Sequence, residues 1–444
     1  MSTVITRIPP SPTGRFHIGT ARTALFNYLF ARNNGGKVVF RSEDTDRARS
    51  KKEFEEEIMN GLTWLGLSWD AFSRQSEHAD RYRELLEKII HEDKAYVSAE
   101  PAKDDPNRTV EVIRLRNPGK IVTFTDLIRG DITFDTTELG DFVIARSITD
   151  ALYHFAVVAD DMDSGITHVI RGEDHISNTP RQILIQEALG APRPAYAHLP
   201  LILDEKRAKL SKRTGATSVM DYRDEGFLPE ALVNYLVLLG WNPGDDREDF
   251  SLAQLVETFS LEGVQKSGAA WNREKLLSVN QRWMRKLSTE EFISRGNLTA
   301  PDIEKLRMAV SLLKDRARTF KEARDMLSGE LSCLFVEPSI ARESLAAKEL
   351  PSHQGMTRTA LESLSEAIKG LPGGVSADVV KETLMPIADA EEAKGKGGRG
   401  AVLWPLRYAL SGQERSPDPF TLVSILGKEE SISRVQKAIG ILEG

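Results

Sequence analysis

The stretch VITRIPPSPTGRFHIGTARTALFNYLFARNNGGKVVFR, residues 4–41, decides the fold of the chain. Its start, residues 4–8, predicts a short strand, which the following prolines must end because proline offers no donor to a sheet. From Ala21 onward the apolar residues fall on one helical face, and Gly35-Gly36 predicts the end of that helix. Residues 37–41 predict a second strand. A strand, a helix and a strand at this spacing indicate a βαβ unit, whose parallel sheet binds ligands at the carboxyl ends of its strands.

The rest of the chain predicts a multidomain α/β protein. Residues 97–152 are rich in strand and turn signals, and residues 153–225 return to alternating strands and helices. Helix patterns dominate from residue 226 to the end. We therefore expect a Rossmann-like domain in two halves, residues 1–96 and 153–225, split by a β-rich insert and followed by a mostly α-helical C-terminal half.

Composition excludes several classes of protein. The 444 residues are 40% hydrophobic and 28% charged, which is typical of a globular protein and not of a membrane or disordered one. The first fourteen residues lack the apolar centre of a signal peptide, so we expect a cytoplasmic protein without a membrane segment. A single cysteine, Cys333, excludes an internal disulfide and a cysteine-rich metal site. The net charge of −7 still allows a nucleic-acid partner, which needs only a local basic face.

The loop SPTGRFHIGT, residues 11–20, predicts a phosphate site. It connects a strand to a helix whose first backbone N–H groups favour an anion, and His17 lies at the same place. For this loop alone, an ordinary turn with a helix-capping histidine is the stronger interpretation. The glycine-rich dinucleotide fingerprint and the G-K-[ST] phosphate loop are both absent here, which argues against NAD and P-loop chemistry.

A second motif, KLSKR at residues 209–213, follows the predicted strand HLPLIL. Its lysines could bind a polyphosphate on which negative charge develops, although a basic stretch by itself is usually a solvated surface. The two motifs together, in this order, resemble the HIGH and KMSKS signatures of the class I aminoacyl-tRNA synthetases. In this chain they are HIGT and KLSKR.

Longer segments narrow the resemblance to the bacterial glutamyl-tRNA synthetases over nearly the whole chain. These segments are RIPPSPTGRFHIGTARTALFNYLFAR, FRSEDTDRARS, YHFAVVADDMDSGITHVIRGEDHISNTPRQ, HLPLILDEKRAKLSKR, KSGAAWNREKLLSVNQRWM and GRGAVLWPLRYALSG. The resemblance implies ATP-dependent ligation of L-glutamate to the 3′ end of tRNA-Glu through a glutamyl-adenylate, with Mg²⁺ accompanying ATP. It leaves open whether tRNA-Gln is also charged.

The resemblance also implies the site residues. The ATP-binding residues would be His17, Gly19, Thr20, Lys209, Ser211, Lys212 and Arg213, of which His17, Lys209 and Lys212 would be catalytic. The glutamate-binding residues would be Arg7, Ser11, Glu43, Tyr153 and Arg171. An arginine can bind the substrate carboxylate and Glu43 the ammonium group. Thr20 replaces the second histidine of HIGH. A structural ion pair with Glu173 or Asp174 is the alternative for Arg171.

The resemblance assigns a role to each segment. Residues 97–152 would bind the acceptor stem, residues 226–300 would form a helical domain that contacts the tRNA stem, and residues 301–444 would bind the anticodon. Many relatives carry a cysteine-rich zinc site just after the position of Tyr96, but this chain has no cysteine there, so we expect no zinc. The family is usually monomeric, so we expect a monomer.

Four other functions remain as alternatives. A nucleotidyltransferase of the HxGH type would share the chemistry of His17 without needing KLSKR or a helical C-terminal half. A glutaminyl-tRNA synthetase would have a β-barrel tail, and the truncated paralogue that glutamylates a modified tRNA base would have none. A tRNA-binding regulatory protein would be expected to have broken motifs, whereas His17, Lys209 and Lys212 are intact here.

Overall fold

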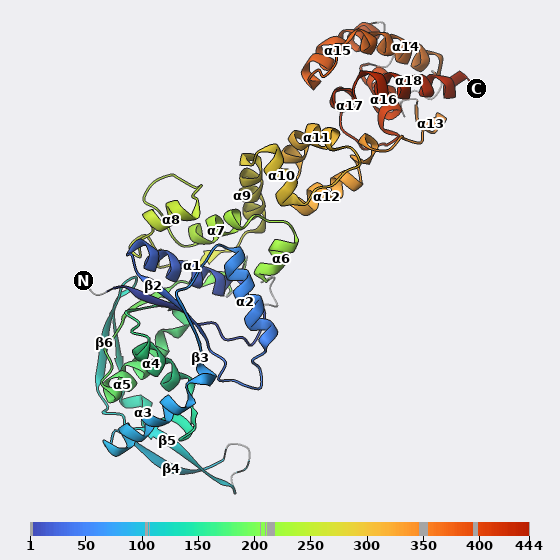
Figure 1. Ribbon diagram of the computed structural model, residues 1–444. Helices are drawn as coiled ribbons and strands as arrows, with labels where there is room; N and C mark the ends of the chain where they lie inside the picture. The colour runs from blue at the N-terminus through green and yellow to red at the C-terminus, as the bar shows by residue number, and fades with distance from the viewer. Residues whose placement is uncertain are drawn as a thin grey trace. The chain divides into compact units, whose positions relative to one another are not determined.

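The computed structural model describes residues 3–443 except 103, 104, 106, 205, 209, 211–217, 346–353 and 394–397. It forms two compact units, Met1–Val279 and Asn280–Gly444, each of which is described by itself (Figure 1). Within the described ranges, no helix combines the length and the apolar character needed to cross a membrane.

The first unit begins with the βαβ pattern that the sequence predicts. β1 (Ile5–Ile8), β2 (Lys37–Ser42) and β3 (Ala71–Arg74) form a parallel sheet in the order β1-β2-β3. α1 (Ile18–Asn33) connects β1 to β2, and α2 (Lys52–Trp64) lies between β2 and β3 in the chain. The turn from α1 into β2 requires glycine, because a Cβ on Gly36 would lie 2.1 Å from the carbonyl oxygen of Val4.

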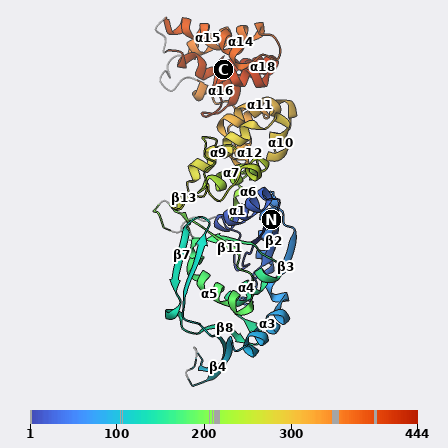
Figure 2. The same cartoon turned by 90° about the vertical axis from the view of Figure 1, so that its left-hand side faces the viewer.

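A second sheet has the order β10-β11-β6-β7. Its strands are β6 (Ile121–Asp126), β7 (Gly130–Asp135), β10 (His168–Gly172) and β11 (Ala195–Leu199). β10, β11 and β6 run parallel, and β7 pairs antiparallel with β6. Figure 2 shows the β-hairpin that carries β7 at the edge of this sheet. The hairpin lies in the segment expected as an insert, and it extends a sheet whose other strands come from the second half of the Rossmann-like domain.

The first and second sheets are joined by hydrogen bonds at the N-terminal ends of β1 and β10. The backbone N–H of Thr167, the residue before β10, donates to the carbonyl of Ile5 in β1 at 3.0 Å, and the Thr167 hydroxyl accepts from the Ile5 N–H at 2.8 Å. β1 and β10 therefore lie side by side and end near one another. Their carboxyl ends are where a parallel α/β sheet binds ligands.

The remaining elements of the first unit surround these sheets. β4 (Ala95–Pro101), β5 (Thr109–Leu115), β8 (Phe142–Ser147) and β9 (Asp150–Ala151) form an antiparallel sheet, and β12 (Ile202–Leu203) pairs with β13 (Ala269–Ala270). The helices are α3 (Ala79–His91), α4 (Tyr153–Asp163), α5 (Thr179–Leu189), α6 (Val219–Asp224), α7 (Pro229–Leu238) and α8 (Leu252–Thr258). α3, α4 and α5 supply Leu86, Phe155 and Ile183 to one buried apolar core. Strands of the two parallel sheets and of the antiparallel sheet also contribute to this core.

All the regular elements described in the second unit are helices, as the sequence predicts for this half. α9 (Arg273–Lys286) crosses from the first unit into the second. The other helices are α10 (Thr289–Gly296), α11 (Ile303–Arg316), α12 (Phe320–Ser328), α13 (Arg342–Leu345), α14 (Gln354–Gly370), α15 (Ala377–Ala393), α16 (Gly400–Ser411), α17 (Pro419–Leu426) and α18 (Lys428–Glu443). α14 to α18 pack on one another, with fully buried Leu361, Leu406 and Val435 among them.

Candidate active site

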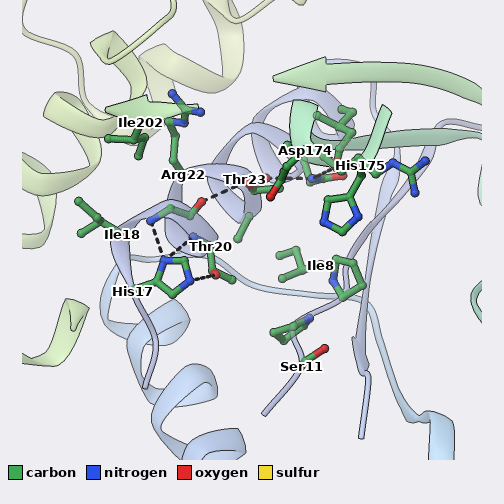
Figure 3. A pocket seen from close by; sticks show the side chains of 18 of the residues that line it. Ile8, Ser11, His17, Ile18, Thr20, Arg22, Thr23, Asp174, His175 and Ile202 are labelled. Carbon is green, nitrogen blue, oxygen red and sulfur yellow. Dashed lines mark hydrogen bonds between the residues drawn. The ribbon is translucent and has the colours of Figure 1, made fainter. Parts of the chain in front are cut away.

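A cavity of about 500 Å³ opens at the carboxyl ends of β1 and β10, beside the first turn of α1 (Figure 3). In Figure 3 His17 and Thr20 lie at the start of α1, and Asp174 and His175 lie on the opposite side of the cavity. The described members of the predicted site all line it: Arg7, Ser11, His17, Gly19, Thr20, Glu43, Tyr153 and Arg171. Residues that are up to 164 positions apart in the sequence, from Arg7 to Arg171, therefore share one pocket.

Four predicted residues of the KLSKR motif, Lys209, Ser211, Lys212 and Arg213, lie outside the described residues. The second residue of the motif, Leu210, is described: it lines the cavity and donates its backbone N–H to the carbonyl of Ile202 at 2.9 Å. The chain therefore reaches the cavity within this motif.

His17 caps the helix that points at the cavity. Its Nδ1 accepts the backbone N–H groups of Gly19 at 3.2 Å and Thr20 at 3.4 Å, and its Nε2 lies 3.2 Å from the Thr20 hydroxyl. An Nδ1 atom that accepts cannot carry a proton, so a neutral His17 holds its proton on Nε2, from where it can be donated to Thr20 or to a bound ligand. The Thr20 hydroxyl thus lies at the helix N-terminus in contact with His17.

Gly19 has to be small at this position. A Cβ added to Gly19 would lie 3.1 Å from Cε1 and Nδ1 of His17. This is tighter than nine in ten real contacts of a Cβ atom, so a side chain here would require the imidazole to shift by a few tenths of an ångström.

The loop that carries His17 is tied to the segment that follows KLSKR. Glu57 of α2 accepts the backbone N–H of Phe16 at 3.1 Å and the hydroxyl of Ser218 at 2.5 Å. The N–H of Val219 donates to the carbonyl of Phe16 at 2.8 Å. Ser218, the first described residue after the motif, is therefore fixed beside His17 by a carboxylate that the sequence analysis did not identify.

A buried ionic cluster forms the floor of the site. Asp161 of α4 accepts from Arg41 at 2.6 Å and from Nε of Arg7 at 3.3 Å, and Arg41 also donates to Glu43 at 3.1 Å. Although burial would raise it, the positive charges of Arg41 and Arg7 hold the pKa of Asp161 below its usual range. Burial raises the pKa of Glu43 despite its contact with Arg41. A cation that arrives beside Glu43 would favour its ionised form.

One nitrogen of the Arg7 guanidinium is available to a ligand. Its Nη1 is buried and has no hydrogen-bond partner within the described structure, although the residue lines the cavity. A buried donor without a partner is costly, and a bound anionic or carbonyl group would satisfy it.

Arg171 is held by neutral groups. Its Nε donates to Nε2 of His198 at 3.2 Å, and its two Nη atoms donate to Gln182 Oε1 at 2.7 Å and Thr179 Oγ1 at 2.9 Å. Only 5% of Arg171 is exposed. Among the described carboxylates none forms an ion pair with it, and Glu173 instead pairs with Arg129. The structure therefore gives no support to the alternative of a structural ion pair with Glu173 or Asp174, and Arg171 lines the cavity without an ion-pair partner among the described residues.

Two histidines near Arg171 have lowered pKa values. Burial, assisted by the charges of Arg181 and Arg171, lowers the pKa of His154 to about 4. Burial and then Arg171 lower the pKa of His175 to about 4. Both imidazoles are therefore neutral at neutral pH. Tyr153 keeps its proton as well, because burial raises its pKa to about 12, so its hydroxyl can donate into the cavity.

These histidines predict a loss of stability in mild acid. Unfolded histidine has a pKa of about 6.5, so between about pH 6.5 and 4 the unfolded chain binds protons that folded His154 and His175 do not. We therefore expect the free energy of unfolding to fall as the pH is lowered through this window. Urea unfolding of the full chain at pH 7.5 and 5.5 measures the change.

A matched pair of variants isolates this effect. His154→Gln should make the decrease between the two pH values smaller, whereas His91→Gln, at an exposed position on α3, should leave it as in the unchanged chain. An equal decrease in His154→Gln and in the unchanged chain would contradict the prediction.

The sequence did not identify several residues that shape the site. Arg41, Asp161, Gln182, Thr179 and His198 hold the predicted ligands in place without being predicted themselves. Arg41 and Asp161 lie within FRSEDTDRARS and YHFAVVADD, two segments on which the family resemblance rests. The sequence of such a segment does not indicate that a charged residue in it will be buried. Their partners are up to 154 residues away, as for Arg7 and Asp161.

Two protein families match the chain. The family described as tRNA synthetases class I (E and Q), catalytic domain, matches residues 3–109 and 100–278, and the family described as anticodon binding domain matches residues 273–439. Glutamate–tRNA ligase 1 of Syntrophus aciditrophicus is 40% identical, with 98% of this chain and 97% of the relative covered. Glutamate–tRNA ligase of Geobacter sulfurreducens is also 40% identical, with 100% of both chains covered.

Solved structures give the same result. A crystal structure of a glutamate tRNA ligase from Elizabethkingia meningosepticum in complex with its amino acid superposes with a TM-score of 0.83 at 33% identity, and covers 99% of both chains. The glutamate-tRNA synthetase of Elizabethkingia anophelis gives a TM-score of 0.80 at 32% identity, with 99% of this chain and 100% of the other covered. The two family matches, the full-length relatives and these structures agree with the geometry of the cavity, and the chain belongs to the glutamate–tRNA ligases, a family of class I aminoacyl-tRNA synthetases with a Rossmann-like catalytic domain and a helical anticodon-binding domain.

Proposed function

We propose that this chain ligates L-glutamate to the 3′ end of tRNA-Glu with the energy of ATP. The observation that carries the proposal is Arg171, a buried cation without a described counter-ion, in the same cavity as the acidic Glu43 and the N-terminus of α1. These groups match the side-chain carboxylate, the ammonium group and the phosphates of a glutamyl-adenylate.

Glutamate binding rests on five residues. Arg171 binds the side-chain carboxylate, Glu43 binds the ammonium group, and Nη1 of Arg7 donates to a substrate oxygen. Tyr153 and Ser11 supply hydroxyl groups at the wall of the cavity. Because glutamate and glutamine have nearly the same shape, a positive charge without a counter-ion is the feature that selects glutamate.

ATP activates the glutamate without a covalent enzyme intermediate. An oxygen of the glutamate α-carboxylate attacks the α-phosphorus, the bond to the β-phosphate breaks, and pyrophosphate leaves. His17, Gly19 and Thr20 bind the phosphates at the start of α1, and Lys209, Ser211, Lys212 and Arg213 hold the leaving pyrophosphate. The terminal ribose hydroxyl of the tRNA then attacks the glutamyl carbonyl, and AMP leaves. Catalysis is positioning and charge stabilisation, for which His17, Lys209 and Lys212 are the central residues.

Mg²⁺ enters this reaction with ATP. Within the described residues there is no group of three or more His, Cys, Asp or Glu side chains arranged to hold a metal ion. When it is bound, Mg²⁺ would be held chiefly by the phosphates of ATP and would neutralise charge on the leaving pyrophosphate.

The segments keep the roles that the family resemblance suggests. Residues 97–152 bind the acceptor stem, residues 226–300 contact the stem of the tRNA, and residues 301–444 bind the anticodon, with residues 1–96 and 153–225 as the two catalytic halves. We propose that the enzyme works as a monomer in the cytoplasm, where tRNA is charged.

Charging of two tRNAs tests the proposed function. The full chain is incubated with ATP, Mg²⁺ and labelled glutamate, and tRNA-Glu and tRNA-Gln transcripts are offered separately. We expect label on tRNA-Glu, and label on tRNA-Gln as well would identify a non-discriminating enzyme. Absence of label on tRNA-Glu would contradict the proposal.

Thr20 provides a prediction about the phosphate side of the cavity. Thr20→Val removes the hydroxyl that contacts Nε2 of His17, and the loss of one hydrogen bond of about 0.5–1.5 kcal/mol should lower kcat by about two- to tenfold. Thr20→Ser keeps the hydroxyl and serves as the control, with kcat close to that of the unchanged enzyme. Equal kcat values for the two variants would show that the hydroxyl has no role.

Zinc analysis tests a further expectation. The only cysteine of the chain, Cys333, lies in the second unit and far in sequence from the segment after Tyr96. We expect elemental analysis of the purified protein to find far less than one zinc per chain, and we expect charging to survive dialysis against a zinc chelator followed by readdition of Mg²⁺. One tightly held zinc per chain would contradict this expectation.

A further inference from the structure

Three neighbouring strands bring an aspartate, a histidine and Arg171 into one row. Arg171 of β10 is the register partner of His198 in β11, and Tyr196 of β11 is the register partner of Asp126 in β6. Residues two apart on a strand share a face of the sheet. Asp126, His198 and Arg171 therefore lie on the same face, although Asp126 comes from the hairpin that the sequence assigns to the insert.

The hydrogen bonds in this row fix where each proton lies. The Arg171 Nε–H can only donate, so Nε2 of His198, 3.2 Å away, must accept. The imidazole proton is then on Nδ1, which lies 2.6 Å from Oδ2 of Asp126. Burial lowers the pKa of His198, while hydrogen bonds from His198, Arg129 and Ile128 hold the pKa of Asp126 below its usual range against the opposing effect of burial. The carboxylate is charged and the imidazole neutral.

His198 and Asp126 are both buried and hydrogen-bonded. His198 is 0% and Asp126 1% exposed. The Asp126 carboxylate accepts four hydrogen bonds, from Nδ1 and the backbone N–H of His198 and from the backbone N–H groups of Ile128 and Arg129. An uncharged amide could not accept all four.

We infer that Asp126 and His198 are positioning residues that set the selectivity for glutamate. Asp126 holds the proton on Nδ1 of His198, and the lone pair of Nε2 then orients the Arg171 guanidinium toward the cavity. The imidazole also keeps the negative charge of Asp126 one ring away from Arg171, so the guanidinium is oriented without being neutralised. A carboxylate in the place of His198 would hold Arg171 equally well but would compete with the substrate for its charge.

This inference rests on the proposed role of Arg171, and one set of variants separates the two. Charging of tRNA-Glu by the full-length enzyme is measured as a function of glutamate, glutamine and ATP concentration. The variants are Arg171→Met, His198→Met, which removes the acceptor, His198→Gln, which keeps an acceptor oxygen for Arg171, and Asp126→Asn. Tyr196→Phe is the matched control, because Tyr196 lies on the same strand as His198, and the change removes a buried hydrogen bond to Gln186 of α5 but keeps the ring beneath Arg171.

We expect His198→Met and Asp126→Asn to raise the KM for glutamate by about tenfold, with the KM for ATP and kcat changed less than about threefold. His198→Gln should recover most of the lost affinity, and Tyr196→Phe should leave it unchanged. An unchanged KM for glutamate in both His198→Met and Asp126→Asn, with a raised KM in Arg171→Met, would overturn the positioning role alone. An unchanged KM in Arg171→Met would overturn the proposed role of Arg171 and this inference with it. If His198→Met does not fold, Asp126→Asn decides the question by the same criterion.

Discussion

We expect Arg171→Met to raise the KM of the enzyme for glutamate by at least about a hundredfold, because two charge-assisted hydrogen bonds of about 1.5–3 kcal/mol each would be lost. No described carboxylate forms an ion pair with the guanidinium, so its charge is available to the carboxylate of the substrate side chain. The preference for glutamate over glutamine should fall by a similar factor, since a neutral substrate never gained from that charge. Steady-state charging of tRNA-Glu at varied glutamate and glutamine measures both effects.

Two further variants separate charge from geometry. Arg171→Lys keeps the charge but loses the planar fork of donors, so its KM should lie between those of the unchanged enzyme and Arg171→Met. Arg193→Met removes an exposed arginine of the same unit, which pairs with Glu187, and should leave the KM unchanged. A KM for glutamate within threefold of normal in Arg171→Met would exclude this residue from substrate selection.

His17→Asn is expected to lower kcat by about a hundred- to a thousandfold, which is the usual cost of removing a donor from a site of developing charge. Asparagine is among the best residues for capping a helix, so this change keeps the cap of α1 while it removes the imidazole. The KM for glutamate should change little, because the proposed ligand of its side chain is Arg171 of β10, which is held by Gln182 and Thr179 of α5.

The comparison with His17→Ala isolates the structural contribution. Alanine loses both the imidazole and the cap, so this variant should unfold more easily by about 1 kcal/mol while its kcat matches that of His17→Asn. Thermal unfolding and single-turnover charging measure the two quantities separately. A kcat of His17→Asn close to that of the unchanged enzyme would mean that His17 serves only as a helix cap.

Local patterns in the sequence were sufficient to predict β1, α1 and β2, the elements that carry much of the site. The apolar run before Pro9, the helical spacing after His17 and the strand after Gly36 predicted β1, α1 and β2, because each depends on residues close in the chain. The helix itself begins at Ile18, three residues before the apolar pattern that predicted it, because the cap from His17 satisfies its first N–H groups.

The contacts that give the site its charge could not be predicted in this way. Asp161 meets Arg7 across 154 residues, and Asp126 meets His198 across 72 residues because their strands are neighbours in the sheet. Glu173 is next but one to Arg171 in the chain, yet its side chain contacts Arg129 of the hairpin loop and the backbone N–H of Leu201 instead. Strand register and burial decide these pairings, and neither is visible in local composition.

A crystal structure of the enzyme with a non-hydrolysable analogue of glutamyl-adenylate would show directly whether Arg171 binds the glutamate side chain. We expect the analogue in the cavity between β1, β10 and α1, with its side-chain carboxylate on Arg171, its ammonium group at Glu43 and the group that replaces the phosphate at His17. An analogue bound outside this cavity, or one whose side-chain carboxylate points away from Arg171, would rule out this mode of binding.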